Sequence, residues 1–285
     1  MPEDFLADQF EENRAHLTRV AYRMLGSTAE ADDAVQEAWL RLRRSESSEI
    51  DNLPGWLTTV TARICLNMLR SRATRREDEW DGHLPDPIIT REGDPSDEAE
   101  LADSVGLALL VVLEVLPPAE RLAFVLHDLF AVPFDEIAEI VDRSPEAARQ
   151  LASRARRRVR SAQVPDPDVA TQRRVVDAFF RAARGGDMST LVSVLDPSVI
   201  LRADHGAEGS VEIRGAEKVA ANAAMFATPD RIEHPVLVNG QAGVIIEMNG
   251  EPFSVMAFTV TDGIIVAIDI LADPARLGGA GLDPR

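Results

Sequence analysis

The chain has 285 residues, 45% hydrophobic and 27% charged, a composition typical of a folded protein with two domains or three small ones. No apolar run reaches the roughly 20 residues of a membrane span, and the acidic N-terminus lacks the apolar core of a signal peptide. The single cysteine excludes an internal disulfide and a cysteine-based zinc site, so we expect a cytoplasmic protein without a membrane segment.

The net charge of −18 argues against a nucleic-acid partner, but the charges are unevenly distributed. Residues 61–76 carry five arginines and no acid, and residues 149–160 carry six arginines and no acid. Residues 77–103 carry eleven acids against one arginine. Two basic segments separated by an acidic one indicate distinct binding surfaces rather than averaged surface charge.

Three helices are predicted in residues 1–76. Apolar residues recur at helical spacing over 17–25, and residues 26–28 (Gly-Ser-Thr) end that helix and cap the next. The second helix repeats the apolar pattern. Pro54 then marks the first turn of a third helix over 54–76, since proline is tolerated where its missing N–H loses no partner.

The acidic segment 77–103 breaks the helical pattern. Pro85, Pro87, Gly93 and Pro95 lie among its acids. This composition predicts a linker with little regular structure.

A second helical block follows the linker. Its helices are predicted at 107–116, 119–130, 134–141 and 145–160. Residues 142–144 (Asp-Arg-Ser) form a tight turn, Ser144 caps the last helix, and Pro145 occupies its first position. A short helix, a three-residue turn and a longer basic helix are typical of a helix-turn-helix.

The remainder of the chain has a different character. After a second linker at 164–167, helices are predicted at 169–183, 188–195 and 216–226, and strands at 199–201, 211–213, 236–238, 243–248, 253–260 and 264–271. Gly240, Asn249-Gly250 and Asp262-Gly263 separate the last four strands as hairpin turns. Helices first and an antiparallel meander last indicate an α+β domain.

The two basic helices are the candidate nucleic-acid readers. The helix at 145–160 has polar side chains in its first turns and cations along its length, as a helix in the major groove requires. A solvated basic helix on a bundle is the alternative. In the helix at 54–76, Asn67 can contact a base, while Trp56 either stacks on an unpaired base or anchors the core.

Sequence runs in both helical blocks resemble a known family. Residues 21–27 (Ala-Tyr-Arg-Met-Leu-Gly-Ser), 32–41 (Asp-Asp-Ala-Val-Gln-Glu-Ala-Trp-Leu-Arg) and 55–60 (Gly-Trp-Leu-Thr-Thr-Val) resemble domain 2 of the extracytoplasmic-function (ECF) RNA polymerase sigma factors. Residues 117–138 and 146–156 are similar to domain 4 of the same family. The α+β tail resembles the SnoaL-like extension of one subgroup, the sigma factor J type.

The resemblance implies three sets of site residues. The set expected to dock on the β′ clamp of core RNA polymerase is Asp32, Asp33, Gln36, Glu37, Trp39 and Leu40. The set expected to bind the −10 promoter element is Trp56, Thr58, Thr59, Arg63, Asn67 and Arg70. The set expected to bind the −35 element is Arg149, Gln150, Ser153, Arg154 and Arg157.

Two motifs of the subgroup are altered in this chain. Its linker motif Trp-Leu-Pro-Glu-Pro is replaced by His-Leu-Pro-Asp-Pro at 83–87. Its glycine-rich Asp-Gly-Gly-Gly-Lys stretch is replaced by Asp-His-Gly-Ala-Glu-Gly at 204–209. Both motifs that support the regulatory contact of the subgroup are therefore altered in this chain.

An enzymatic role for the tail is the weaker hypothesis. Ketosteroid isomerase chemistry needs a tyrosine in its oxyanion hole, and the one tyrosine, Tyr22, lies in the first helical block. Asp204 with His205, or His234, could act as acid and base, but adjacent residues of a strand point to opposite faces. We expect no enzyme activity, no metal and no cofactor.

These patterns predict a multidomain protein: two all-α helical sigma domains, the second with the helix-turn-helix, followed by an α+β SnoaL/NTF2-like cone domain. The expected boundaries are 1–76 for sigma domain 2, 77–103 for the acidic linker, 104–163 for sigma domain 4 and 168–277 for the SnoaL-like domain.

The expected function is promoter-specific transcription initiation. The expected partners are core RNA polymerase, through its β′ clamp and β flap, and promoter DNA. The tail is expected to contact the sigma domains within the chain and to regulate them. The alternative is a stand-alone helix-turn-helix regulator with a ligand-sensing tail, which would not need residues 32–40.

Overall fold

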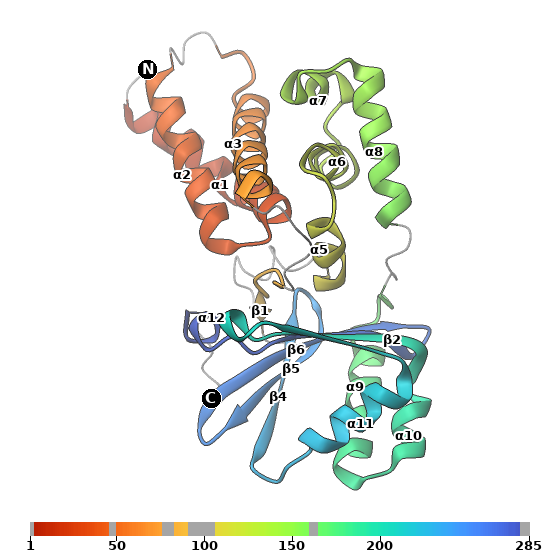
Figure 1. Ribbon diagram of the computed structural model, residues 1–285. Coiled ribbons are helices and arrows are strands. Elements are labelled where there is room, and N and C mark those ends of the chain that lie inside the picture. The colour runs from red at the N-terminus through yellow and green to blue at the C-terminus, as the bar shows by residue number, and fades with distance from the viewer. Residues whose placement is uncertain (1–2, 46–49, 76–82, 91–105, 160–164, 280–285) are drawn as a thin grey trace. The chain divides into compact units, whose positions relative to one another are not determined.

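The structure is a computed structural model that describes residues 3–45, 50–75, 83–90, 106–159 and 165–279 (Figure 1). The chain divides into two compact units. The first consists of Met1–Glu79 with Val112–Ser161, and the second of Trp80–Val111 with Ala162–Arg285.

Three helices open the first unit: α1 (Glu3–Leu25), α2 (Thr28–Arg44) and α3 (Leu53–Arg75). The Ser27 hydroxyl accepts a hydrogen bond from the Glu30 N–H at the start of α2, and the Asn52 side chain accepts one from the Gly55 N–H at the start of α3. The three predicted helices are therefore present, with the expected turn and cap between the first two.

The second helical block contributes α6 (Pro118–Phe124), a π-helical turn η2 (Val125–Leu129), α7 (Phe134–Val141) and α8 (Pro145–Val159). The helix α5 (Leu107–Glu114) spans the sequence boundary between the two units. The helix predicted at 119–130 is divided, because its second half forms the π turn η2. Within this turn, the ring of His127 stacks on Phe134 with the ring centroids 3.8 Å apart. The Nδ1 atom of His127 lies 2.9 Å from the Val132 carbonyl.

The turn between α7 and α8 has the predicted chemistry. Asp142 adopts the left-handed conformation (φ 57°) that ends α7, and the Ser144 hydroxyl accepts a hydrogen bond from the Ala147 N–H. Ala148, Leu151, Ala152 and Ala155 bury one face of α8. The opposite face of this basic helix is left to solvent.

The second unit contains a seven-stranded sheet in the order β1-β4-β5-β6-β7-β2-β3. Its strands are β1 (Ile89–Thr90), β2 (Leu195–Asp204), β3 (Ser210–Arg214), β4 (Arg231–Val238), β5 (Gln241–Met248), β6 (Glu251–Thr261) and β7 (Ile264–Leu271). Strands β4 to β7 form the predicted antiparallel meander, whereas β2 pairs with β7 in parallel.

The hairpin turns of the meander are the ones that the sequence predicted. Asn249 and Gly250 have φ of 56° and 84°, and Asp262 and Gly263 have φ of 53° and 74°. Two consecutive residues with positive φ define the type I′ turn, which asparagine, aspartate and glycine tolerate best. The turns set the pairing next to them, and one-residue shifts at Ile246/Glu247 and Thr259/Val260 change the register further along β5, β6 and β7.

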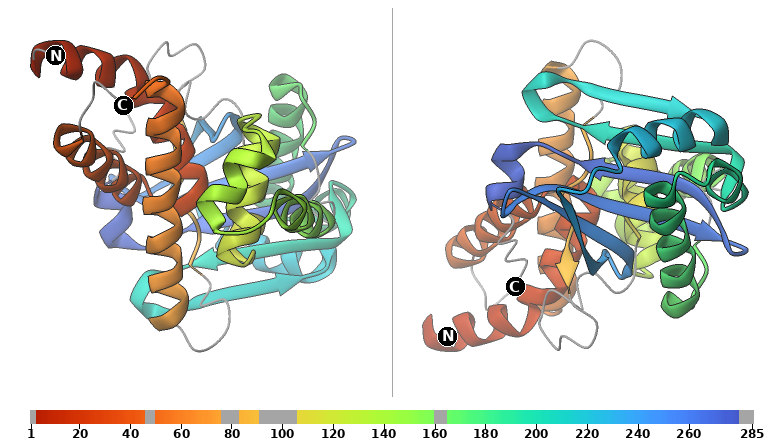
Figure 2. Two further views of the ribbon diagram at one scale, coloured as in Figure 1. Left: turned by 90° about the horizontal axis from the view of Figure 1, so that it is seen from above. Right: turned by 90° about the horizontal axis from the view of Figure 1, so that it is seen from below.

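Three helices, α9 (Val169–Gly185), α10 (Met188–Ser193) and α11 (Ala216–Phe226), lie on one face of the sheet (Figures 1 and 2). Phe179 of α9, Val219 of α11 and Phe258 of β6 belong to one apolar core between these layers. A 3₁₀ turn η3 (Gly206–Glu208) joins β2 to β3, and α12 (Pro274–Gly279) follows β7. The tail is an α+β domain with an NTF2/SnoaL-like fold.

Part of the predicted linker belongs to this second unit. Ile89 and Thr90 form β1 and pair antiparallel with Val238 and Leu237 of β4. A two-residue strand carries no periodicity, so the sequence did not reveal it. The remaining residues of the acidic linker, 77–82 and 91–103, lie outside the described residues.

Candidate functional site

The predicted polymerase-docking residues all lie on α2. Asp32, Asp33 and Gln36 are exposed, whereas Ala31, Ala34, Val35, Ala38 and Leu42 bury the opposite face of the helix. Glu37 is partly exposed and pairs with Arg41 at 2.9 Å. The structure therefore gathers the acidic residues of this set into one solvent-facing surface.

Trp39 and Leu40 border this acidic surface and are half-buried. The Trp39 ring packs on Phe10 of α1, with the ring centroids 5.1 Å apart. The tryptophan thus both supports the α1–α2 contact and contributes apolar area to the edge of the exposed face.

The predicted −10 residues divide between the exposed and buried faces of α3. Arg63, Asn67 and Arg70 are exposed, and Trp56 and Thr59 are half-buried. Thr58 is only 8% exposed, and its hydroxyl donates to the Pro54 carbonyl at 2.9 Å. Thr58 therefore lies beneath the surface on which the other residues of the set are displayed.

The predicted −35 residues lie on α8, and four of them share its exposed side. Arg149, Gln150, Ser153 and Arg157 are exposed at a spacing that places them along one helix face. Arg149 also lies 5.6 Å above the ring of Phe134 and 3.6 Å from the Glu146 carboxylate. These contacts orient a cation at the N-terminal end of α8, where base edges are usually contacted.

Arg154, the fifth residue of this set, is engaged inside the helical block. The Glu120 carboxylate of α6 is 7% exposed and accepts from Arg154 at 2.8 Å and from Arg158 at 2.5 Å. Arg156 pairs with Asp128 at 2.7 Å. The sequence pattern did not reveal these ion pairs, because the acids lie 28 to 38 residues away from the arginines in the chain.

A buried cation joins the two helical blocks within the first unit. Arg121 of α6 is 1% exposed and donates to the Arg23 carbonyl of α1 at 3.3 Å and to the Glu114 carboxylate at 3.0 Å. The single cysteine, Cys65 of α3, is buried nearby; burial raises the pKa of its thiol to about 12, although the positive charge of Arg121 opposes the rise. Arg121 lies within the run that resembled domain 4, but nothing in the sequence pattern marked it as a contact.

Two further contacts join the same blocks. Arg63 of α3 donates to the Glu139 carbonyl of α7 at 3.2 Å, and the Arg23 guanidinium lies 5.1 Å from the ring centroid of Phe130. Burial lowers the pKa of Arg23 to about 10, and its Nε atom is buried without a hydrogen-bond partner. One predicted −10 residue is thus in contact with the helix-turn-helix in this conformation.

The altered linker motif at 83–87 is bound by the tail. The Asp204 carboxylate, 2% exposed at the end of β2, accepts from the Leu84 N–H at 2.9 Å and from Arg276 of α12 at 2.8 Å. Arg276 also donates to the Leu84 carbonyl at 2.8 Å and to the Asp86 carboxylate at 2.6 Å. Aspartate at position 86 therefore forms an ion pair where the subgroup motif has glutamate.

A second set of bonds holds the end of this segment. The Asn239 side chain accepts from the Ile88 N–H at 3.1 Å, and the Asn239 N–H donates to the Ile88 carbonyl at 2.8 Å. Leu84 and Ile88 are 1% and 5% exposed. We call residues 83–90 with Asp204, Asn239 and Arg276 the linker anchor. Asn239 and Arg276 carried no signal in the sequence.

The proposed acid and base residues of the tail are not brought together. His205 lines a pocket under the helices, whereas Asp204 contacts the linker. His234 lies 2.9 Å from Glu247. Among the described residues, no three histidine, cysteine, aspartate or glutamate side chains form a metal-binding group, and no helix is long and apolar enough to cross a membrane.

Two regions of the chain match known family profiles. Residues 9–75 match the family profile of Sigma-70 region 2, and residues 106–159 match that of Sigma-70 region 4. The chain is 38% identical over 270 residues to the probable ECF RNA polymerase sigma factor SigI of Mycobacterium tuberculosis H37Rv, with 93% of this chain and 92% of that protein covered.

The chain is also 38% identical over 301 residues to the ECF RNA polymerase sigma factor SigJ of the same strain, covering 97% of this chain and 95% of that protein. The crystal structure of the extracytoplasmic function sigma factor SigJ from M. tuberculosis superposes with a TM-score of 0.78 at 35% identity, covering 97% of this chain and all of that one. The similarity thus extends through both helical blocks and the tail.

Proposed function

The chain belongs to the ECF sigma factors of RNA polymerase and carries a SnoaL-like domain at its C-terminus, and we propose that this domain regulates the sigma domains by binding the linker between them. Proteins of this family bind core RNA polymerase and promoter DNA. The observation that carries the proposal is the linker anchor, in which Asp204 and Arg276 of the tail bind the chain at residues 84–86.

Core polymerase is proposed to dock on the exposed face of α2. Asp32, Asp33 and Gln36 present their side chains to solvent, with Glu37, Trp39 and Leu40 at the border. We assign this face to the β′ clamp and the second helical block to the β flap. An acidic surface with an adjacent aromatic side chain suits a partner with basic residues around an apolar center.

Promoter DNA is proposed to contact α3 and α8. Arg63, Asn67 and Arg70 would bind the −10 element, with Trp56 and Thr59 beside them. Thr58 is buried and would contribute indirectly, through its hydrogen bond to the Pro54 carbonyl at the start of α3. Arg149, Gln150, Ser153 and Arg157 would enter the major groove at the −35 element, with Arg154 joining them if it leaves Glu120.

The two DNA elements are too far apart for the conformation described here. Their centers are separated by roughly 25 base pairs, or about 85 Å of duplex at about 3.4 Å per base pair. In the first unit, Arg63 of α3 touches the Glu139 carbonyl of α7, so the −10 helix and the helix-turn-helix are in contact. We infer that this contact opens on promoter binding and that the tail's hold on the linker determines how readily it opens.

A catalytic role for the tail is not part of this proposal. Sigma factors are not typically enzymes. Asp204, the candidate base, is engaged by the Leu84 N–H and Arg276, and the only tyrosine of the sequence lies in α1. The pairing of Asp204 with the linker supports a regulatory role.

Binding to core RNA polymerase tests the proposal directly. We expect the full chain to bind core enzyme, and the double charge reversal Asp32→Lys/Asp33→Lys to weaken binding at least tenfold. The matched control is Asp8→Lys/Glu12→Lys, which changes the charge equally at exposed positions of α1. Equilibrium binding to labeled core enzyme gives the comparison.

Equal loss of binding in both double variants would show general electrostatic attraction rather than docking on α2. Failure of the unaltered chain to bind core enzyme would favour the stand-alone regulator. Deleting residues 168–285 should change transcription from a promoter that the full chain uses, and an unchanged rate would contradict regulation by the tail.

A further inference from the structure

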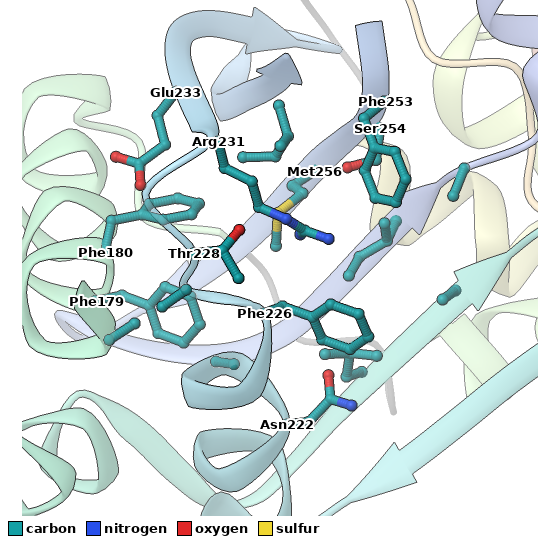
Figure 3. Close-up of a pocket in the computed structure, with 18 of the residues that line it drawn as sticks. Phe179, Phe180, Asn222, Phe226, Thr228, Arg231, Glu233, Phe253, Ser254 and Met256 are labelled. Carbon is teal, nitrogen blue, oxygen red and sulfur yellow. The ribbon is translucent and has the colours of Figure 1, made fainter. Parts of the chain in front are cut away.

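A pocket lies between the helices and the sheet of the SnoaL-like domain (Figure 3). Its cavity volume is about 200 Å³, and its wall is mostly apolar, with aromatic side chains from α9, α11 and β6. The larger apolar side chains are Phe179, Phe180, Phe226, Phe253 and Met256. An apolar wall offers few hydrogen-bond partners, so a polar group inside the pocket loses part of its ordinary solvation.

A cation from β4, Arg231, extends into this apolar space. Figure 3 shows the Arg231 side chain extending from the start of β4 into the pocket, between Phe226 and Phe253. Its guanidinium carbon lies 5.0 Å and 4.7 Å from the centroids of these two rings. Two cation–π contacts fix the position of the guanidinium, but they do not neutralise its charge.

Arg231 has no anionic partner among the described residues. Its Nε atom is buried and makes no hydrogen bond. Burial lowers the pKa of the guanidinium, and no neighbouring carboxylate counteracts that effect. A partly desolvated cation of this type gains stability from any anion that can enter the pocket.

The acid nearest in sequence, Glu233, also lines the pocket, but another lining residue, Arg184, is its ion-pair partner. It lies two residues along β4, and Figure 3 shows its carboxylate pointing away from Arg231. Glu233 pairs with Arg184 of α9 at 3.5 Å. Burial raises the pKa of Glu233 and Asp177 adds to the rise, whereas Arg184 opposes it. The charges of Glu233 and Arg184 offset each other, which leaves Arg231 as the uncompensated charge facing the cavity.

We propose that this pocket binds a small organic monocarboxylate with an aromatic or compact apolar body, the carboxylate pairing with Arg231. An engineered apolar cavity of roughly 150 Å³ accommodates benzene, so about 200 Å³ accommodates a ring with a short carboxylate arm. The planar guanidinium donates two parallel hydrogen bonds to a carboxylate. The hydroxyl groups of Thr228 and Ser254, which also line the pocket, add donors beside it.

The same features select against other small molecules. An amine would place a second positive charge against Arg231, and a neutral amide would leave the guanidinium charge uncompensated. A dicarboxylate would bury a second anion against the phenyl rings of the wall. Binding of this ligand class goes beyond the proposed regulation and does not depend on it.

Calorimetric titration of the full chain tests the assignment. The probes are phenylacetate, its neutral isostere phenylacetamide and the cationic phenethylamine, each titrated to 10 mM at one ionic strength. We expect phenylacetate to bind at least tenfold more tightly than either analogue. Arg231→Gln should weaken phenylacetate binding at least tenfold, and Arg231→Lys should retain part of the affinity because it keeps the charge.

The matched control is Arg214→Gln, which removes an arginine from the same domain. Arg214 is exposed on β3, pairs with Glu212 at 2.7 Å and does not line the pocket, so its variant should bind phenylacetate normally. Thermal unfolding of Arg231→Gln establishes that the variant is folded. The proposal is overturned if phenylacetate does not bind the unaltered chain, if phenylacetamide binds equally well, or if Arg231→Gln binds as the unaltered chain does.

Discussion

The linker anchor and the contact between the two helical blocks both restrain this chain, but they differ in how their polar groups are satisfied. In the anchor, both oxygens of Asp204 accept hydrogen bonds and Arg276 donates to three acceptors, Asp204, Asp86 and the Leu84 carbonyl. The anchor also adds a strand to the sheet. Its charges and backbone groups are therefore compensated within the tail.

In the contact between the helical blocks, not every buried polar group has a hydrogen-bond partner. Arg121 has two acceptors, but the Nε atom of Arg23 is buried without one, and burial holds the pKa of Arg23 at about 10. An unsatisfied buried polar group costs about 1–3 kcal/mol. The contact through Arg63 is an exposed hydrogen bond to a backbone carbonyl.

The difference indicates which restraint opens first. Releasing the linker from the anchor would break satisfied hydrogen bonds and ion pairs. Separating the helical blocks, in contrast, would hydrate Arg23 and make Arg63 available to DNA. We infer that the tail keeps its hold on the linker while the sigma domains separate.

The largest effect is expected from Arg121→Met, which removes the buried cation but keeps the side-chain volume. Removing one partner of a buried pair costs about 3–5 kcal/mol, and we expect about 3 kcal/mol here because Glu114 is 19% exposed and regains water. Urea unfolding measures the change. Arg156→Met, which breaks the more exposed pair with Asp128, should cost less than about 1 kcal/mol.

The Cys65 thiol reports whether the same substitution separates the blocks. In the unaltered chain Cys65 is fully buried and its pKa is raised to about 12, so it should not react with a disulfide reagent at pH 8. Arg121 lowers this pKa, so its removal alone would slow the reaction of a thiol that stays buried. Labeling at least tenfold faster in Arg121→Met would therefore show exposure, and unchanged labeling would show that the blocks stay together.

The raised pKa also predicts a pH dependence of stability. The folded chain holds the Cys65 proton more tightly than the unfolded chain does, because the pKa rises from 9.0 to about 12 on burial. The stabilisation is complete below pH 9 and is lost as the pH rises from 9 towards 12. Cys65→Ala should show a smaller fall in unfolding free energy than the unaltered chain over this range.

A smaller effect is expected from Asp204→Asn, which removes the anchor's charge but keeps its shape. Hydrogen bonds to charged groups contribute about 1.5–3 kcal/mol, and Arg276 retains Asp86, so we expect about 2 kcal/mol. Hydrogen exchange at the Leu84 amide, which donates to Asp204, should accelerate at least tenfold. Asp196→Asn, on the same strand but bonded only to nearby Ser198, should leave that amide protected. Equal protection in both variants would contradict the anchor.

Most of the secondary structure could be predicted from the sequence because its signals are local. Ser27, Ser144 and the paired turn residues Asn249-Gly250 act within a few residues of themselves. The candidate surfaces on α2 and α8 were predictable for the same reason, since helical spacing determines which side chains share a face.

The remaining contacts depend on residues far apart in the chain. Asp204 meets Leu84 across 120 residues, and Arg276 meets Asp86 across 190. Glu120 pairs with Arg154, which lies 34 residues away in the chain. Counting the arginines of residues 149–160 therefore overstated the number of cations available to DNA. Neither β1 nor the position of Arg231 has a periodic signal, because both are determined by the assembled sheet.

The smallest effect on stability, and the sharpest test of the order of opening, is expected from Arg63→Gln. Its hydrogen bond to the Glu139 carbonyl is exposed, so unfolding free energy should change by less than about 0.5 kcal/mol and Cys65 should stay unreactive. If Arg63 leaves Glu139 to bind DNA, the variant bound to core polymerase should lose affinity for a −10 single strand at least fivefold, as anisotropy of a labeled oligonucleotide measures. Arg19→Gln on α1, outside the proposed DNA-binding set, is the control for lost charge. Unchanged oligonucleotide affinity in Arg63→Gln would mean that the contact with α7 occupies no DNA-binding group, and opening would then have to be explained by Arg23 alone.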